Sequence, residues 1–334
     1  MYKSLFLFSS LAAVVMMSGC AQRISVKALI PAEIDRATST KKIAITEFKN
    51  DFVGLSSKIE ANLANQRIDN QTFFTLVSRS DIDKVIREQK IQNSGLVEPK
   101  DAVEVGNLIG AQAIISGDVG QVTSSDSFYY ESRSKCADKK CSELVYYNVG
   151  CNMRVVGLSA QIRMIDIAKG DIIYADTMAK TAEFRHCIDD YRAIPSTEIA
   201  AQSLANDISQ TFSYKLTPHY RYFDVVLLED ADLDYNKAQE KLLESSLEYI
   251  KQNRYDKAEK LLMELIDATD RKSLVAFYNL GVVKEAQGEF IKAQEYYKMA
   301  DALMVEPIEE VSTAYNRIGL MITNQVKSQE QMSR

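Results

Sequence analysis

A strand–helix–turn–helix–strand pattern over residues 73–118 constrains the fold more than any other part of the sequence. An apolar run of strand formers at 73–77 precedes a helix that Ser80 caps. Pro99 begins a second helix and Gly110 ends it, because proline loses nothing at a first helical position and glycine tolerates the left-handed backbone that ends helices. An apolar strand follows directly. Strands joined through helices predict a mixed α/β sheet, and no residue of this stretch suggests a catalyst.

The same stretch resembles a phrase shared by the family of the curli secretion lipoprotein, CsgG. Its members carry V-x-R-S-D-(I/L)-D-K-V, then E-Q and S-G-L, and finally G-A-x-A before a glycine. The residues that fit this phrase are Val77, Arg79, Ser80, Asp81, Asp83, Lys84, Val85, Glu88, Gln89, Ser94, Gly95, Leu96, Gly106, Gly110, Ala111, Ala113 and Gly117. The resemblance implies an α/β (α+β) CsgG-like sandwich domain with a β-hairpin extension, which we place at residues 42–222.

The N-terminus has the pattern of an export signal. Lys3 precedes an apolar run at 5–17, which is too short to span a membrane permanently. Small residues and then Cys20 follow this run, and they resemble the processing site of bacterial lipoproteins. We therefore predict a lipoprotein signal peptide at 1–19 and acyl chains such as palmitate on Cys20, an anchor that hardly dissociates. Ala21 then favours the outer membrane, with the protein facing the periplasm; an ordinary cleaved signal with an incidental cysteine is the alternative.

Alternation of apolar and polar residues predicts the strands of the first domain. Residues 20–41 contain a proline and many polar residues, so we expect a lipidated tether there. The first strand is predicted at 42–48 and two long strands at 153–167 and 171–184. Residues 124–152 predict a hairpin extension that has aromatic flanks and a charged tip.

Four cysteines remain once Cys20 is lipidated, and two of them belong to this hairpin. Facing residues of an antiparallel hairpin have positions with a constant sum. The positions of Cys136 and Cys141 sum to 277, and this register places Tyr130 opposite Tyr147 as an aromatic pair. We predict the disulfide Cys136–Cys141.

The second pair follows from the next hairpin. Its turn centres on Lys169, which gives a sum of 338, and the positions of Cys151 and Cys187 have the same sum. We therefore predict the disulfide Cys151–Cys187, formed in the oxidising periplasm. Four free thiols are the alternative.

The C-terminal third predicts an all-α domain like tetratricopeptide (TPR) repeats. An acidic linker is expected at 223–237, the helical domain at 238–325 and a tail at 326–334. A set of small and aromatic residues recurs after 35 positions, as in such arrays. The set is Tyr255, Ala258 and Leu262, which recurs as Phe290, Ala293 and Tyr297. An unrelated helical hairpin is the alternative.

Helical arrays of this kind present a concave surface to peptide segments. We expect the partner-binding residues of the array to be Tyr255, Phe277, Asn279 and Lys284.

The sequence shows no signature of catalysis, of a cofactor or of a metal site. His186 and His219 have no cluster of ligand residues at metal-binding spacing, and Cys136 and Cys141 lack a second ligand pair. Phosphate-binding, dinucleotide and nucleophile motifs are also missing. A net charge of −6 gives no indication of nucleic-acid binding. We therefore expect a protein that is not an enzyme.

Three functions fit these observations. The first is an assembly or adaptor factor, anchored in the outer membrane, for envelope biogenesis or for secretion of curli-like surface subunits; its array would bind a periplasmic or secreted partner. The second is an oligomeric secretion channel, since the founding member of the family forms a ring whose subunits each send two hairpins through the membrane. Only ten residues separate Phe184 from Pro195, too few for a second hairpin. The third is regulation of a cell-wall synthase.

Overall fold

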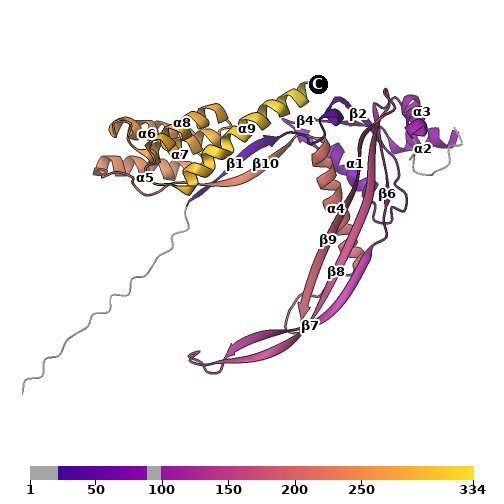
Figure 1. Cartoon of the computed structure of the whole chain (residues 1–334), viewed down its shortest axis with the longest axis horizontal. Coiled ribbons are helices and arrows are strands. Elements are labelled where there is room, and N and C mark those ends of the chain that lie inside the picture. Colours follow the sequence, from indigo (N-terminus) through magenta and orange to yellow (C-terminus); the bar gives the residue numbers. More distant parts are fainter. Residues whose placement is uncertain (1–21, 89–98) are drawn as a thin grey trace, which may run out of the picture. The chain divides into compact units, whose positions relative to one another are not determined.

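The computed structural model describes residues 22–88 and 99–334, so the predicted signal peptide and Cys20 lie outside the described residues. The chain divides into two compact units, which are described separately (Figure 1). Of the described residues, the helical unit comprises those up to Ala28 and Tyr222–Ile322, and the sheet unit comprises those from Leu29 to Arg221 and Thr323–Arg334. The change of unit at Tyr222 lies where the sequence predicts the end of the first domain.

A six-stranded mixed sheet forms the centre of the sheet unit. Its order is β5–β2–β6–β8–β7, and β9 pairs with the other edge of β8. The strands are β2 (Lys42–Ile45), β5 (Thr75–Leu76), β6 (Ala113–Val119), β7 (Thr123–Cys136), β8 (Leu144–Asp166) and β9 (Ile172–Cys187). Strand β2 is parallel to β5 and β6, as expected for strands joined through helices, whereas β8 is antiparallel to β6, β7 and β9. A short antiparallel pair, β3 (Arg67–Ile68) with β4 (Gln71–Thr72), lies apart from this sheet.

Helices cover both faces of the sheet. The helices are α1 (Leu55–Asn65), α2 (Arg79–Glu88), α3 (Pro99–Ile109) and α4 (Thr197–Leu216). Helices α1 and α4 pack on one face in the larger apolar cluster, which includes Ile59, Leu204 and Phe212. Helices α2 and α3 contribute Ile82 and Val105 to a smaller cluster on the opposite face. The mixed α/β class predicted from the sequence is confirmed.

The predicted tether over residues 20–41 is wrong from Arg23 onward. Strand β1 (Arg23–Ile30) pairs with β10 (His219–Val226), and a 3-10 helix, η1 (Asp35–Ser39), follows. In β1 the residues Ile24, Val26 and Ala28 are buried and the residues between them are exposed. This alternation is the period of a half-buried strand, and the polar residues hid it in the sequence.

Five helices form most of the helical unit. They are α5 (Lys237–Lys251), α6 (Tyr255–Ala268), α7 (Leu274–Ala286), α8 (Phe290–Leu303) and the first part of α9 (Glu309–Ser333). Helices α6 and α8 begin 35 residues apart, as the recurring set indicates. Gly281 lets α7 approach Tyr297 closely, because a Cβ at this position would lie 2.5 Å from the tyrosine ring. The C-terminal helices are confirmed, whereas a tetratricopeptide repeat is not.

The predicted tail at 326–334 is also wrong, because α9 continues to Ser333. Within the sheet unit, the Gln331 side chain accepts a hydrogen bond from Ala32 N at 2.7 Å and donates one to Ala32 O at 3.1 Å. Arg334 forms an ion pair with Asp35 at 2.6 Å. The end of the chain therefore holds residues that the sequence analysis assigned to the tether.

The hairpin of β7 and β8 extends beyond the part of the sheet that α4 covers, and Figure 1 shows it as a long curved ribbon. We call its outer part, residues 128–150, the arm. Within residues 22–88 and 99–334, no helix has the length and apolar character needed to cross a membrane.

Candidate functional site

The residues predicted to bind a partner in the helical unit are mostly buried. Phe277, Asn279 and Lys284 are at most 4% exposed, and Tyr255 is partly buried. The Lys284 ammonium lies 2.6 Å from a carboxylate oxygen of Glu259 and 3.6 Å from one of Glu289. These side chains therefore hold the helices together and do not form an exposed surface in this structure.

Asn279 is occupied by the chain itself. Its side-chain oxygen accepts a hydrogen bond from Leu228 N at 3.0 Å, and its amide nitrogen donates one to Leu228 O at 2.7 Å. The Tyr278 hydroxyl donates a hydrogen bond to Val226 O at 2.7 Å. Helix α7 thus holds the segment that contains Val226 and Leu228 through the backbone of that segment.

The predicted linker at 223–237 is wrong at its start, where β10 runs to Val226, and at Asp232, which has structural partners in α7. The Asp232 carboxylate accepts a hydrogen bond from Val275 N at 3.3 Å, at the N-terminus of α7, and another from the Ser273 hydroxyl at 3.0 Å. A carboxylate at a helix N-terminus satisfies backbone N–H groups that the helix leaves free. The sequence shows only a run of charges here, and a run of charges is usually a solvated segment.

A buried ion pair lies at the centre of the helical unit. Glu285 is fully buried and accepts two hydrogen bonds from Arg317, at 2.9 and 2.8 Å, and one from the Tyr297 hydroxyl at 2.5 Å. Burial and the nearby Glu285 carboxylate raise the pKa of Tyr297 well above its usual value. Burial lowers the pKa of Arg317, but the hydrogen bonds and charge of Glu285 outweigh it and the net shift is upward. The carboxylate oxygens of Glu285 are therefore engaged by Arg317 and Tyr297, and the group holds helices of this unit together.

Both predicted cysteine pairs are bonded in the structure. The Cα atoms are 4.6 Å apart in Cys136–Cys141 and 3.9 Å apart in Cys151–Cys187. Cys151 stands directly opposite Cys187, so the predicted register of the second hairpin, with a sum of 338, agrees with the observed pairing. A bulge between Met164 and Ile165 shifts the pairing by one residue only near the turn.

The predicted register of the first hairpin is wrong by three residues. Cys136 faces Leu144, so the positions of facing residues sum to 280, and Tyr130 faces Gly150 in place of Tyr147. Cys141 lies in the turn, beyond the end of the strands. The turn is wide because the Asp138 carboxylate accepts hydrogen bonds from the backbone N–H groups of Lys140 and Ser142, each at 3.0 Å. The disulfide closes this turn and does not mark facing strand positions.

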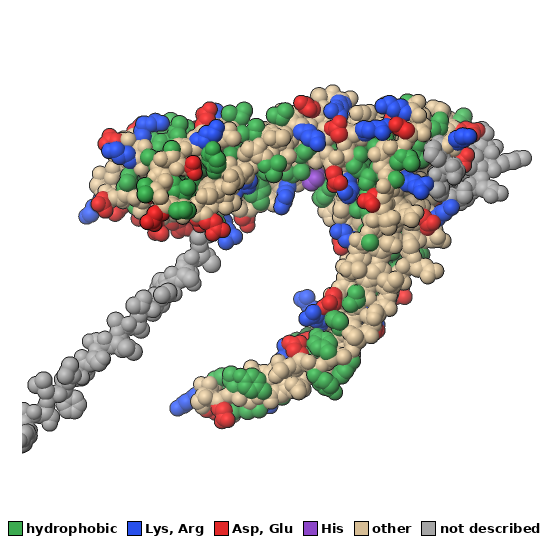
Figure 2. Space-filling model, in the orientation of Figure 1, with side chains coloured by type: hydrophobic (Ala, Val, Ile, Leu, Met, Phe, Trp, Pro, Cys, Tyr) green, Lys and Arg blue, Asp and Glu red, His purple; other side chains and the backbone are tan. Residues whose placement is uncertain are grey.

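One face of the arm carries large apolar side chains that nothing in the described chain covers. We call it the open face and define it by Phe128, Tyr130, Leu144, Tyr146 and Ile188, which are 47–83% exposed. The Phe128 and Tyr130 rings meet edge to face at 5.1 Å, and a Cβ at Gly150 would lie 2.8 Å from Phe128. Ile188 lies beside them, since its backbone N–H bonds to Gly150 O at 3.1 Å. Figure 2 shows hydrophobic side chains gathered on the arm.

The other side of the arm, which we call the latched face, is covered only in part, by charged groups of the same chain, and its Val145 and Tyr147 are 42% and 41% exposed. It carries Tyr129, Glu131, Arg133, Val145 and Tyr147, which alternate with the open-face residues along the strands. Arg133 lies 3.7 Å from Asp189 and 3.8 Å from Asp190, in the loop after β9. The Lys135 ammonium lies 5.5 Å from the centre of the Tyr147 ring.

The aromatic flanks of the hairpin were visible in the sequence, but the open face was not recognised there. A signal does exist, because the run 144–147 is apolar at every position, whereas a strand with one solvated face alternates. A search for strands that alternate apolar and polar residues does not detect such a run, because both faces are apolar. The position of Ile188 beside Gly150 depends on the pairing of β8 with β9, which no local pattern contains.

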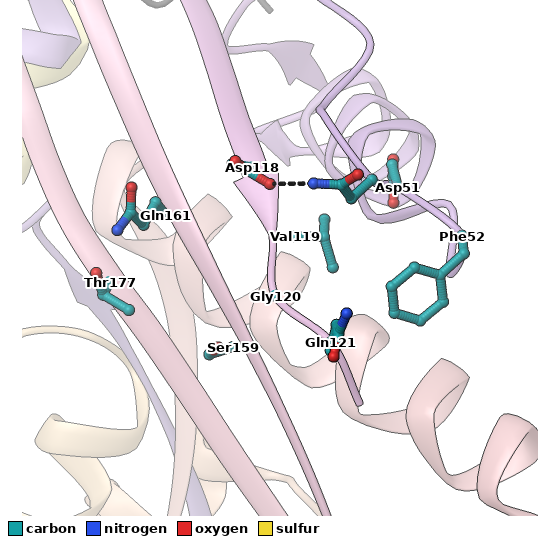
Figure 3. Close-up of a pocket in the computed structure, with 10 residues that line it drawn as sticks. Asp51, Phe52, Asp118, Val119, Gly120, Gln121, Ser159, Gln161 and Thr177 are labelled. Carbon is teal, nitrogen blue, oxygen red and sulfur yellow. Dashed lines mark hydrogen bonds between the residues drawn. The ribbon is translucent and has the colours of Figure 1, made fainter. Parts of the chain in front are cut away.

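A shallow groove of 790 Å³ lies beyond the carboxyl ends of β2 and β6 (Figure 3). Its charged groups already have partners. Asp51 caps α1 by accepting hydrogen bonds from Leu55 N at 2.6 Å and Ser56 N at 2.9 Å, and Asp118 accepts one from the Asn50 amide at 3.0 Å. Among the groove residues there is no nucleophile beside a base, so the groove shows no arrangement for a reaction.

The described residues hold no cluster that fits a metal ion. The one group of suitable composition is Glu131 with Cys151 and Cys187, and these cysteines are bonded to each other and offer no thiolate. His186 directly precedes Cys187 but is not a member of this group, and neither is His219. His186 Nδ1 lies 2.6 Å from Arg192 O, and the His219 ring stacks on Tyr214 at 4.2 Å.

Comparison with protein families gave a match to part of the chain. Residues 17–128 match the family described as curli production assembly/transport component CsgG. The match supports the resemblance read from residues 77–117, and it extends from the predicted processing site to the first part of β7. Most of the arm, β8, β9 and the helices of the helical unit lie outside it. Comparison with curated proteins gave no match.

Several solved structures are similar at low scores. They are the LpoB C-terminal domain from Salmonella enterica (TM-score 0.26, 13% identity, 44% of this chain and 95% of that one), lipoprotein GNA1162 from Neisseria meningitidis (0.27, 11%, 52% and 98%) and the PelC dodecamer from Paraburkholderia phytofirmans (0.22, 13%, 58% and 98%). We draw no functional conclusion from similarities at this level.

Proposed function

We propose that this chain, whose residues 17–128 match the family of the curli production assembly/transport component CsgG, is an envelope-associated lipoprotein that acts as an adaptor. It is anchored in the outer membrane through Cys20, faces the periplasm and holds a periplasmic or secreted protein in an assembly or secretion process. The family match supports a role in assembly, and the lipoprotein processing sequence supports the anchor. The adaptor has no catalytic role and needs no cofactor.

The observation that carries this proposal is the open face of the arm. Exposed apolar patches on a folded protein mark binding surfaces, because leaving such side chains in water costs free energy that a partner recovers. Two disulfides hold the strands that present this patch, so the arm presents a preorganised surface. The helical unit, by contrast, uses the residues predicted for binding in its own packing.

The adaptor role is tested by isolating the tagged, lipidated full chain from envelopes after chemical cross-linking. We expect one envelope or secreted protein to be enriched at least tenfold over an unrelated tagged lipoprotein, and deletion of this chain to impair the process that needs the enriched protein. Stepwise conductance of the purified protein in planar bilayers, together with no enriched partner, would overturn the adaptor role and favour the secretion channel.

The anchor is tested separately by Cys20→Ser. Acyl chains supply nearly all of the membrane affinity of a lipoprotein, at about 0.8 kcal/mol per buried CH₂, so the variant should move from the membrane to the soluble fraction. A variant that stays with the outer membrane would show that another part of the chain holds it there.

A further inference from the structure

The open face continues a face of the sheet that already binds a helix. Residues Val156, Leu158 and Ala160 of β8 lie in the apolar cluster under α4, and residues at even positions of β8 share that face. Helix α4 begins where Thr197 bonds to Ser124 at 3.2 Å and Pro195 O accepts a hydrogen bond from Arg154 at 3.1 Å. Beyond this point the same face goes on without a helix. It carries the apolar groups of the open face, with the small or polar residues Ser132, Ser134 and Asn148 between them.

The uncovered part of this face has the dimensions of one helix. It extends from Phe128, opposite Asn152, to Cys136, opposite Leu144. Eight residue steps at about 3.3 Å give roughly 26 Å, and a helix of about 17 residues has this length. Two strands make a strip about 10 Å wide, which is the diameter of a helix with its side chains.

The turn at the tip of the arm, residues 137–143, carries Lys139 and Lys140 together with the carboxylates of Asp138 and Glu143. Lys139 and Lys140 are exposed, and no ion pair of either is found in the part of the chain that the structure describes. The Asp138 carboxylate is engaged by Ser142 and by backbone N–H groups of the turn, and the hydrogen bonds from Ser142 are the main cause of its lowered pKa. An acidic group on a bound segment would therefore find two cations at this end of the face.

We propose that the open face binds one amphipathic α-helix of a partner protein, about 17 residues long, whose apolar stripe packs on Phe128, Tyr130 and Tyr146 and whose acidic end lies at Lys139 and Lys140. The helix takes the position on the arm that α4 takes on the rest of this face. This inference rests on the proposed adaptor role and names the class of segment that the adaptor holds. The latched face cannot serve in the same way, because Arg133 and its carboxylate partners lie across it.

The test is photocrosslinking in cells with the lipidated full chain. The photoreactive residue p-benzoylphenylalanine replaces Tyr130 or Tyr146 on the open face, and Tyr147 on the latched face as the matched control. We expect adducts to one partner from both open-face positions and at least tenfold less adduct from position 147.

The spacing of the cross-linked peptides identifies the conformation of the bound segment. Tyr130 and Tyr146 lie four strand positions apart, since Tyr130 faces Gly150. This is about 13 Å, which corresponds to about nine residues of a helix but four residues of an extended strand. Adducts seven to eleven residues apart on the partner support the proposal.

Four outcomes overturn it. They are adducts about four residues apart, adducts to a second copy of this chain, adducts to lipid alone, and no adduct from either open-face position. If affinity isolation still enriches a partner in any of these cases, the adaptor role stands and the helix on the open face does not. A charge-reversed tip, Lys139→Glu with Lys140→Glu, should lower the adduct yield from Tyr146 more than that from Tyr130.

Discussion

The helical unit and the arm each present a surface to an extended or helical segment, but only one of these surfaces is already occupied. In the helical unit, Asn279 bonds to both backbone groups of Leu228 and Asp232 caps α7, so residues of the same chain take the place of a ligand. On the arm, Tyr130 and Tyr146 face solvent, and no described segment covers them. The contrast shows that a repeat-like sequence does not by itself identify a free binding surface.

The two regions also differ in what their polar groups do. The helical unit buries an ion pair and several amide contacts, so substitutions there act on folding. The arm keeps its charges at the surface and closes its strands with disulfides, so substitutions on its open face should act on binding.

The largest loss of stability is expected for Glu285→Ala in the helical unit. The substitution leaves the Arg317 guanidinium largely buried without its carboxylate, and breaking such a pair costs about 3–5 kcal/mol. Urea unfolding of the full chain measures this change. Glu264→Ala, an exposed position of α6, is the control and should change the free energy of unfolding by less than about 0.5 kcal/mol. Equal effects of the two variants would show that Glu285 is not the centre of the packing described here.

Removing the two disulfides of the sheet unit should have unequal effects. The bond Cys151–Cys187 closes a loop with a sequence separation of 36, against 5 for Cys136–Cys141. The chain-entropy model gives about 3–4 kcal/mol for the first and about 2 kcal/mol for the second. Paired Cys→Ser variants in urea unfolding test the order, after peptide mapping of the non-reduced protein has established which pairs are bonded. A crosslink between Cys141 and Cys151 would contradict both assignments.

Part of the structure could be predicted from the sequence. The strand–helix pattern over 73–118, Gly110 as a helix end and the register that joins Cys151 to Cys187 all follow from local periodicity and turn position. The register of the first hairpin does not, because Asp138 widens the turn through hydrogen bonds that a count of positions ignores. The prediction took the two cysteines to face each other across a regular turn. The observed register differs by three residues because the turn is wider than that.

The remaining errors concern contacts between residues far apart in the sequence. Residues 20–41 were expected to be a tether, because polar residues hide a strand whose partner, β10, lies about 200 positions later. The residues at 223–237 were expected to be a solvated linker, because nothing local shows that Asp232 meets the start of α7. For the same reason Asn279 and Lys284 were expected to bind a partner, whereas their contacts lie within the chain.

The occupied surface of the helical unit is tested by Asn279→Ala. The variant leaves the backbone N–H and C=O of the partly buried Leu228 without these partners. The cost should lie toward the lower end of the range of about 1–3 kcal/mol for a buried unsatisfied group. Hydrogen exchange should rise in residues 226–232 and stay unchanged in the arm. Asn316→Ala on the exposed side of α9 is the matched control. Unchanged exchange at 226–232 would mean that the segment is held by contacts other than this amide.

The smallest effect on folding is expected on the open face itself, and it separates a binding surface from a structural one. Tyr146 is 70% exposed, so Tyr146→Thr, which keeps a good strand former, should change the free energy of unfolding by less than about 0.5 kcal/mol. Tyr147→Thr on the latched face should cost more, about 0.5–1 kcal/mol, because it removes the ring beneath the Lys135 ammonium. The order for partner capture should be the reverse, with a loss of at least tenfold for Tyr146→Thr and less than twofold for Tyr147→Thr. Urea unfolding and quantitative cross-linking of the same two variants give both orders. If Tyr146→Thr destabilises the fold more than Tyr147→Thr does, the open face is part of the protein's own packing, and the contrast between the arm and the helical unit is lost.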